Sequence, residues 1–348
     1  MNDSTSLPPL RERAAGTLAH IEQHFALGNG DYREKSGGRD ASFAWGHGVL
    51  VSAFVAASAF DSERYLPLLA AQAGALRRGY WRPDGPVAGY NASRSLTGAP
   101  ARYYDDNAWF AIAYGDAAAR RLTGAPYKRF AQDALDFALS GRDPKTGGLF
   151  WQEQHKTSQN TCSAAPTAVG ATIVTGSDAD AFPLYEWLHK TLRDPADGLY
   201  WDNISVPNGV IDRAKWSYNS ALVLRLELQL ARRKNGEMYR DRAIQLADAC
   251  LAHWYDGDQK ILKDDSMFAH LLNEALLETY TVTKLPRFRD AALHSLDTLW
   301  SRVRRADGSY PKRWDAHATD KDPTELLWIA SAARAYAFAV PYETAKHA

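Results

Sequence analysis

The sequence predicts an all-α protein, an (α/α)6 toroid of about twelve helices in which an outer ring of helices surrounds an inner ring. Two observations support this prediction. A loop signature of Asp, Gly and an aromatic residue occurs six times, at spacings of about 50 to 60 residues. Between the loops, apolar residues recur at three- and four-residue steps on Ala-rich faces, which is typical of closely packed helices. An open α-solenoid of the same hairpins is the alternative, and the six-fold count favours closure.

The signature loops divide the chain into helical hairpins. They cover residues 28–38, 82–90, 142–151, 193–202, 256–265 and 305–314. The expected helices cover residues 11–27, 42–59, 62–79, 106–122, 127–140, 161–176, 179–191, 217–234, 237–254, 266–283, 287–303 and 323–340. Proline marks two boundaries, because Pro126 follows a Gly-Ala break and Pro286 opens a helix. We expect one domain over residues 1–348, with a short flexible N-terminus of about residues 1–10.

Composition limits the class of partner. The 348-residue chain has 41 basic and 41 acidic residues, so its charge gives no sign of nucleic acid or an anionic membrane as a partner. No stretch is long and apolar enough to span a bilayer, so we expect no membrane insertion. The first ten residues lack the pattern of a signal peptide, which favours a cytoplasmic protein unless a leader has been removed.

Metal and cofactor sites are not expected. Cys162 and Cys250 lie far apart in apolar surroundings, as buried small hydrophobic residues do. The His residues are dispersed, without the spacing of metal ligands. No phosphate loop or dinucleotide fingerprint is visible either.

The segments that enter the inner helices of a toroid converge at one mouth of the barrel. In this chain they are rich in polar and aromatic residues, which a binding cleft requires. These segments cover residues 43–47, 103–106, 159–162, 215–219, 263–265 and 320–322.

Residues 103–109 (YYDDNAW) place two adjacent carboxylates, Asp105 and Asp106, between aromatic residues at the start of a helix. Acids in this position often cap a helix or complement its dipole. Glycoside hydrolysis also needs two carboxyl groups, one to protonate the leaving oxygen and one to attack the anomeric carbon or activate water. Aromatic faces stack on sugar rings. The surrounding rings favour the second interpretation.

Four motifs together resemble the α-1,6-mannanases of glycoside hydrolase family 76. They are residues 103–109 (YYDDNAW), 147–152 (GGLFWQ), 162–166 (CSAAP) and 216–219 (WSYN). The resemblance implies an (α/α)6 fold and a retaining glycosidase for α-mannosidic, in particular α-1,6, bonds of mannan or manno-oligosaccharides. Asp105 would then be the nucleophile and Asp106 the acid/base. Adjacent residues at a helix entry can hold their carboxyl groups about 5 to 6 Å apart, close to the separation expected of retaining enzymes.

The chain departs from the family pattern at two places. Ser220-Ala221 follow Asn219 where family members often have Gln-Gly, and Ala164 stands where Asn is common. Both departures touch candidate contacts to the substrate.

A carbohydrate substrate would meet further side chains at the mouth. Asp264 and Asp265 could hydrogen-bond sugar hydroxyls, with capping ahead of Ser266 as the alternative. Trp216 is a candidate for the cleft or for the core. The candidate substrate-binding residues are Tyr103, Tyr104, Asn107, Trp45, Trp151, Gln152, Trp216, Tyr218, Asn219, Asp264 and Asp265.

Two other functions fit a toroid with a polar mouth. A sugar epimerase of the N-acylglucosamine 2-epimerase type needs His residues at the mouth for proton transfer, and only His47 and His270 are candidates. A non-catalytic glycan-binding protein would need no acid/base pair, and the pair Asp105-Asp106 argues against it.

Overall fold

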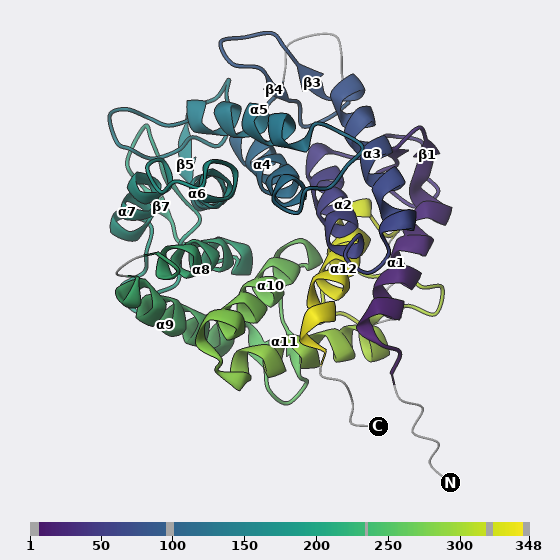
Figure 1. Ribbon diagram of the computed structural model, residues 1–348. Helices are drawn as coiled ribbons and strands as arrows, with labels where there is room; N and C mark the ends of the chain where they lie inside the picture. Colours follow the sequence, from purple (N-terminus) through teal and green to yellow (C-terminus); the bar gives the residue numbers. More distant parts are fainter. Residues whose placement is uncertain (1–6, 95–100, 234–235, 318–322, 344–348) are drawn as a thin grey trace.

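The computed structural model describes residues 7–94, 101–233, 236–317 and 323–343, and within these ranges the chain forms twelve α-helices in two concentric rings (Figure 1). The predicted (α/α)6 toroid is confirmed. The helices are α1 Leu10–Phe25, α2 Ala44–Ala57, α3 Ser62–Gly79, α4 Tyr104–Ala119, α5 Tyr127–Ser140, α6 Thr161–Thr175, α7 Ala181–Thr191, α8 Ser217–Ala231, α9 Glu237–Trp254, α10 Ser266–Thr283, α11 Pro286–Thr298 and α12 Leu326–Ala339.

The even-numbered helices form the inner ring, and the ring closes. Helix α2 packs on α4, α4 on α6, α6 on α8, α8 on α10, α10 on α12, and α12 returns to α2. Each odd-numbered helix covers an inner one from outside, as α5 covers α4 and α9 covers α8. The contact between α12 and α2 joins the two ends of the chain, so the fold is a closed toroid and not an open solenoid.

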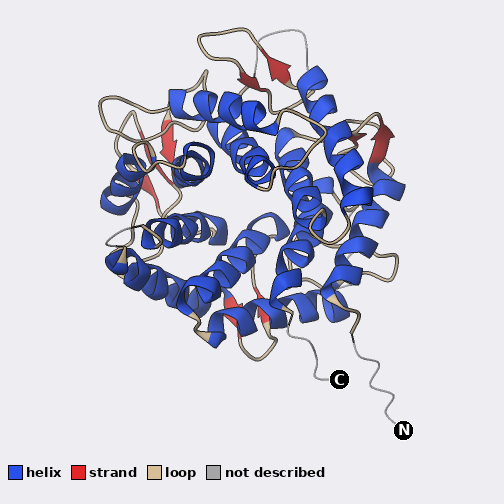
Figure 2. Cartoon of the chain, viewed as in Figure 1, coloured by secondary structure: helices blue, strands red, loops and turns tan. Residues whose placement is uncertain are grey.

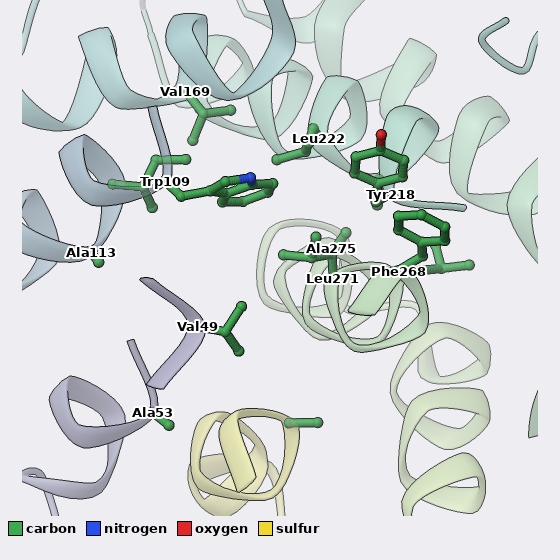
Figure 3. Close-up of a cluster of buried hydrophobic side chains, with 14 of the residues drawn as sticks. Val49, Ala53, Trp109, Ala113, Val169, Tyr218, Leu222, Phe268, Leu271 and Ala275 are labelled. Atoms are coloured by element: carbon green, nitrogen blue, oxygen red, sulfur yellow. The ribbon is translucent and has the colours of Figure 1, made fainter. Parts of the chain in front are cut away.

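The sequences of the helices explain which ring each one joins. In α6 the twelve residues Thr161–Thr172 are all buried, which suits a helix with neighbours on every side. Helix α5 buries one stripe, with Tyr127, Ala131 and Ala134 among its members, and leaves the opposite face to solvent. Figure 3 shows where the inner faces meet: Val49, Trp109, Val169, Leu222 and Leu271 come from five inner helices and gather in one apolar cluster.

Small residues let the inner helices approach closely. A Cβ added to Gly115 on α4 would lie 2.7 Å from a methyl group of Ile173 on α6, closer than carbon atoms pack. Small residues on the inner helices, such as Gly115, therefore permit the close packing that the Ala-rich faces of the sequence predict.

Short antiparallel hairpins occupy several of the connections between helices, and the sequence did not predict them (Figure 2). Each strand has two or three residues, so tertiary contacts and not a strand periodicity determine it. The strands are β1 Ala26–Gly28, β2 Asp31–Tyr32, β3 Trp81–Arg82, β4 Gly89–Tyr90, β5 Ser158–Asn160, β6 Asn203–Ser205, β7 Ile211–Asp212, β8 Tyr255–Asp256 and β9 Ile261–Leu262.

Two helix boundaries differ from the prediction in an instructive way. Helix α4 begins at Tyr104 and not at residue 106, because Tyr103 is the last residue with extended backbone. Asp105 and Asp106 therefore belong to the first turn, where acids complement the helix dipole. Helix α11 ends at Thr298, and the π-helical turn Leu299–Val303 continues it to the predicted end.

Charged residues are buried between the inner helices, about two turns beyond their N-terminal ends. Arg334 of α12 donates two hydrogen bonds to Glu274 of α10, at 2.7 and 3.0 Å. Arg225 of α8 pairs with Glu278 at 3.0 Å and lies 3.9 Å from Glu274. These ion pairs connect three helices of the inner ring.

None of the helices in the described part of the chain is long and apolar enough to cross a membrane. Of the N-terminus predicted to be flexible, residues 1–6 lie outside the described ranges, and α1 begins soon after them at Leu10.

Candidate active site

A cavity of about 580 Å³ opens at the end of the barrel where the inner helices begin. Its wall includes residues from the first turns of all six inner helices, among them Trp45, Cys162, Tyr218, Phe268 and Leu327. Four of the six predicted mouth segments contribute to this wall, namely residues 43–47, 103–106, 159–162 and 215–219. The full lining is Glu34, Phe43, Trp45, Gly46, Ala92, Tyr103, Asp105, Asp106, Trp151, Ser158, Asn160, Cys162, Asp202, Asn203, Trp216, Tyr218, Phe268 and Leu327.

Asp105 is held in the cavity wall by three contacts. Its Oδ1 accepts a hydrogen bond from the backbone N–H of Asp106 at 3.0 Å. Its Oδ2 accepts one from the indole Nε1–H of Trp151 at 3.1 Å, and the thiol of Cys162 lies 3.7 Å from the same oxygen. The helix is not capped by this acid, because the N-cap residue is Tyr103 and no side chain caps the turn.

The surroundings of Asp105 set its charge. Burial raises the pKa of Asp105 to about 6, although the hydrogen bonds from Trp151 and from the backbone of Asp106 favour the charged form. Asp105 is therefore ionised at neutral pH, with its charge directed by two donors.

Asp106 has a different environment. Within the described part of the chain, no donor reaches its carboxyl group, which faces the cavity. Burial raises the pKa of Asp106 well above its usual range, and the charge of Asp105 raises it further. The two adjacent carboxyl groups thus have different environments: donors hold Asp105, whereas burial and the neighbouring charge favour the neutral form of Asp106. Such a difference suits acid/base chemistry.

The loop before β5 places Trp151. Gly147 has a φ of +81°, a conformation that L side chains rarely adopt, and a Cβ on Gly148 would lie 2.5 Å from the indole of Trp187. Beyond this turn the backbone N–H of Tyr104 donates to the carbonyl of Trp151 at 3.0 Å. The first turn of α4 and the loop that carries the indole are therefore joined directly.

Aromatic side chains line two parts of the cavity. Tyr103 and Trp151 lie with ring centroids 4.9 Å apart beside the acid pair. Tyr218 stacks on Phe268 at 4.3 Å, and Trp216 lies 5.5 Å from the same ring. Trp151 and Trp216 are 42% and 38% exposed, so both keep a face available to a sugar ring.

The structure brings seven of the predicted site residues into the cavity wall and leaves four near it. Tyr104 is buried against Phe137, with centroids 5.1 Å apart. The amide of Asn107 donates to the carbonyls of Tyr90 and Tyr103, which fixes β4 against α4. The seven are Tyr103, Asp105, Asp106, Trp45, Trp151, Trp216 and Tyr218, and the other four are Tyr104, Asn107, Gln152 and Asn219.

Gln152 and Asn219 support residues that do line the cavity. Gln152 forms a backbone bridge with Tyr103. Asn219 is buried and donates from Nδ2 to the Oδ1 of Asp202 at 3.1 Å.

Asp264 and Asp265 lie outside the cavity wall. Asp264 accepts a hydrogen bond from the backbone N–H of Ser217 at 2.9 Å and so binds the first turn of the neighbouring helix α8. Asp265 pairs with Lys312 at 3.1 Å and Arg313 at 3.5 Å. The sixth mouth segment of the sequence analysis, residues 320–322, is outside the described residues.

Sequence reasoning missed four residues of the wall that carry clear chemistry: Glu34, Phe43, Asp202 and Phe268. Asp202 ends a signature loop and Glu34 lies inside another, so their positions in the loops were a usable signal. Phe43 was noted only as part of an entry segment. Phe268 is the third residue of α10, and its sequence context is that of an ordinary core residue.

Neither of the two candidate histidines forms a proton-transfer site at the mouth. His47 is fully buried between Gln72 and Tyr80, and His270 is 2% exposed with its Nδ1 3.1 Å from the carbonyl of Ser266. Burial lowers the pKa of His270 to about 4, so it is neutral. Neither residue lines the cavity, which disfavours the epimerase alternative.

The described residues contain no group of three or more His, Cys, Asp or Glu side chains placed to hold a metal ion.

Comparison with solved structures finds the same architecture. An α-mannanase of glycoside hydrolase family 76 from Bacteroides thetaiotaomicron is 26% identical, with 96% of each chain covered and a TM-score of 0.91. An α-1,6-mannanase of that family from a Salegentibacter species is 21% identical, with 96% of this chain and 100% of that chain covered and a TM-score of 0.82. A further structure contains α-1,6-mannotriose bound to an inactive variant of the Salegentibacter enzyme, in which two consecutive aspartates are replaced by asparagine. This chain is 21% identical to that variant, with 96% of this chain and 100% of that chain covered and a TM-score of 0.80.

The family assignment rests on the sequence as well. A search of curated proteins found no match. The model of glycosyl hydrolase family 76 matches residues 12–297, which is most of the chain and includes the acid pair. With this match, and with two adjacent carboxyl groups in the wall of an aromatic cavity, the chain is a glycosidase that belongs to glycosyl hydrolase family 76.

Proposed function

We propose that this glycosidase hydrolyses α-mannosidic bonds, in particular the α-1,6 bonds of mannan or manno-oligosaccharides, with retention of anomeric configuration. The family and the α-mannanases that share the fold support the sugar. The aromatic lining supports a carbohydrate ring as the ligand, since flat apolar faces and polar tips suit a polyol.

In the first step Asp105 attacks the anomeric carbon through a carboxylate oxygen. Asp106 gives its proton to the glycosidic oxygen, the bond to the leaving sugar breaks, and a glycosyl ester forms on Asp105. The donors around Asp105 hold the carboxylate in one orientation and leave it charged.

In the second step Asp106, now ionised, removes a proton from a water molecule. The oxygen of that water attacks the anomeric carbon, the ester bond breaks, and Asp105 returns as a carboxylate. Both displacements invert the anomeric carbon, so the net outcome is retention.

One observation carries the division of roles. Trp151 and Cys162 contact Asp105, whereas no described donor reaches the carboxyl group of Asp106. A nucleophile benefits from fixed orientation, and an acid/base must remain free to reach the substrate oxygen.

The test is hydrolysis of α-1,6-mannotriose by the wild type and by Asp105→Asn and Asp106→Asn. We expect each substitution to lower kcat by at least about 100-fold while the thermal unfolding transition remains cooperative. Asp136→Asn, an exposed acid on α5, is the matched control and should retain activity. An active variant at position 105 or 106, or initial formation of the β-anomer by the wild type in NMR spectra, would refute the proposal.

Azide separates the two roles with an activated aryl α-mannoside. In Asp105→Ala, azide takes the place of the nucleophile and should give the β-mannosyl azide. In Asp106→Ala, azide attacks the glycosyl ester and should give the α-mannosyl azide. The opposite pair of anomers would exchange the roles of Asp105 and Asp106.

A further inference from the structure

A second cavity, of about 770 Å³, adjoins the one that holds the acid pair. Glu34 and Phe43 line both cavities. Ala92 lines the first and its neighbour Ser93 lines the second, so the wall is continuous along two separate segments of the chain. The second cavity is lined by Leu27, Glu34, Lys35, Gly38, Arg39, Asp40, Ala41, Phe43, Ser93 and Arg94.

The loop between β2 and α2 forms most of this second cavity, and it is anchored at several points. The N–H of Glu34 donates to the carbonyl of Asp40 at 2.9 Å. The carboxylate of Glu34 accepts from the hydroxyl of Ser42 at 2.6 Å and from the N–H of Phe43 at 3.1 Å. The N–H of Ser36 donates to the carbonyl of Thr324 before α12 at 3.1 Å. The cavity is therefore formed without a ligand, as binding sites for small molecules usually are.

Phe43 lies at the junction and is unusually exposed. Its side chain is 57% accessible to solvent, although the residue forms the N-cap of a helix that is buried almost throughout. Its backbone holds the junction together, and its ring adds nothing to the core. An exposed ring at the junction of the two cavities suits a saccharide chain that extends from one to the other.

The polar groups of the second cavity suit a neutral polyol. Arg39 and Asp40 are exposed, and in the described part of the chain neither side chain has a hydrogen-bonding partner. Lys35 lies 3.4 Å from Glu325, and Arg94 donates to Asp31 at 2.7 Å. Acids and bases are interleaved, so donors and acceptors are both available to hydroxyl groups, without the excess of one sign that a charged ligand would require.

We propose that the second cavity binds further units of the saccharide chain whose scissile bond lies at Asp105 and Asp106, with Phe43 as the stacking residue between the two cavities. This inference rests on the proposed function and adds to it. The substrate is a chain long enough to occupy both cavities, and the residues around Phe43 determine the preference for length.

The test compares kcat/KM for α-1,6-linked manno-oligosaccharides of increasing length, from the disaccharide to the hexasaccharide. For the wild type we expect kcat/KM to rise with length. In Phe43→Ala the advantage of the longest over the shortest substrate should fall by about tenfold, as expected from the loss of one stacked ring. Arg39→Ala, which changes the second cavity alone, should lower the same ratio by a smaller factor.

Phe182→Ala is the matched control, because Phe182 is an exposed ring on the outer helix α7 and lies in neither cavity wall. It should leave the ratio unchanged. Calorimetric binding of the same series to the Asp105→Asn variant, with and without Phe43→Ala, gives a readout that does not need turnover. Equal kcat/KM and equal affinity for all lengths would overturn the inference and leave the hydrolysis standing. Length-dependent affinity without any hydrolysis would instead refute the proposed function and support the second cavity.

Discussion

At the scale of single residues, the site depends on the different hydrogen-bonding environments of the two adjacent aspartates. Asp105 faces an indole N–H and a thiol, and Asp106 faces the cavity. Burial raises the pKa of both carboxyl groups. The difference between them comes from the donors that favour the charged form of Asp105 and from the charge of Asp105, which raises the pKa of Asp106 further. Trp151 therefore orients the carboxylate of Asp105 and also forms part of the cavity wall.

Replacing Trp151 by Phe should shift the pH dependence of hydrolysis. The proposed mechanism requires Asp105 to be ionised and Asp106 to be protonated. The kcat/KM of the wild type should therefore rise with pH through about 6 and fall again as Asp106 loses its proton. Without the indole donor the charged form of Asp105 is less stable, so its pKa rises and the rising limb moves to higher pH.

The measurement is the pH profile of kcat/KM for Trp151→Phe. Trp201→Phe is the matched control, because the indole of Trp201 donates to Asp194 at the same distance of 3.1 Å but lies outside the cavity wall. A rising limb that stays in place in Trp151→Phe would show that the indole does not set the charge of Asp105.

At the scale of elements, the first turn of α4 and the loop before β5 act as one unit. The loop turns at Gly147 and packs Gly148 against Trp187 and Gln159. Gln159 in turn donates to Asp143 at 2.9 Å and to Thr146 at 2.7 Å, so the loop is held from both sides. The position of Trp151 is decided by packing at a glycine that never touches the substrate cavity.

Gly148→Ala should therefore reduce both stability and activity. The added methyl group would overlap the side chain of Gln159 and lie 2.5 Å from the indole of Trp187, so the loop must move. We expect a loss of about 1–3 kcal/mol in the free energy of unfolding, together with a fall in kcat/KM. Urea denaturation and hydrolysis assays measure the two effects.

Gly16→Ala controls for the general effect of such a change. Gly16 lies inside α1 with no atom near the place of a Cβ, so alanine there should stabilise the protein by about 0.5–1 kcal/mol. Normal stability and activity of Gly148→Ala would mean that the loop adapts without moving Trp151.

At the scale of the whole molecule, a closed ring needs contacts that tie distant parts of the sequence together. The buried pair of Arg334 with Glu274 joins α12 to α10, and Arg334 also donates to the carbonyl of Ser52 on α2. Burial alone would raise the pKa of Glu274, but Arg334 and Arg225 together outweigh burial and hold that pKa below its usual value. Glu274 is thus charged across the neutral range.

Glu274→Gln should destabilise the ring by about 3 kcal/mol, because it leaves a buried guanidinium without its carboxylate. The pH dependence follows from the sign of the shift. With a lowered pKa in the folded state, the contribution of Glu274 is complete above the unfolded value near 4.5 and is lost as the pH falls through the folded value. The variant should therefore lose less stability than the wild type on acidification.

Urea denaturation at neutral and acidic pH measures both effects. Asp248→Asn is the control, since its pair with Arg287 is nearly half exposed on both sides and should contribute less than about 1 kcal/mol. A Glu274→Gln protein as stable as the wild type would show that the pair does not hold the ring together.

The sequence by itself determined the twelve-helix toroid and the two acids of the site. Both depend on local patterns: a helix is encoded by its period and its breakers, a loop by Gly and Asp, and the acid pair by adjacent residues. What only the tertiary structure decided is which side chains meet at the mouth. In the structure, Phe268 lies in the cavity wall, and Asp264 accepts a hydrogen bond from the first turn of α8. A second cavity adjoins the first at Phe43. These contacts join segments far apart in the chain, and their geometry follows from the packing of whole helices, which no local pattern records.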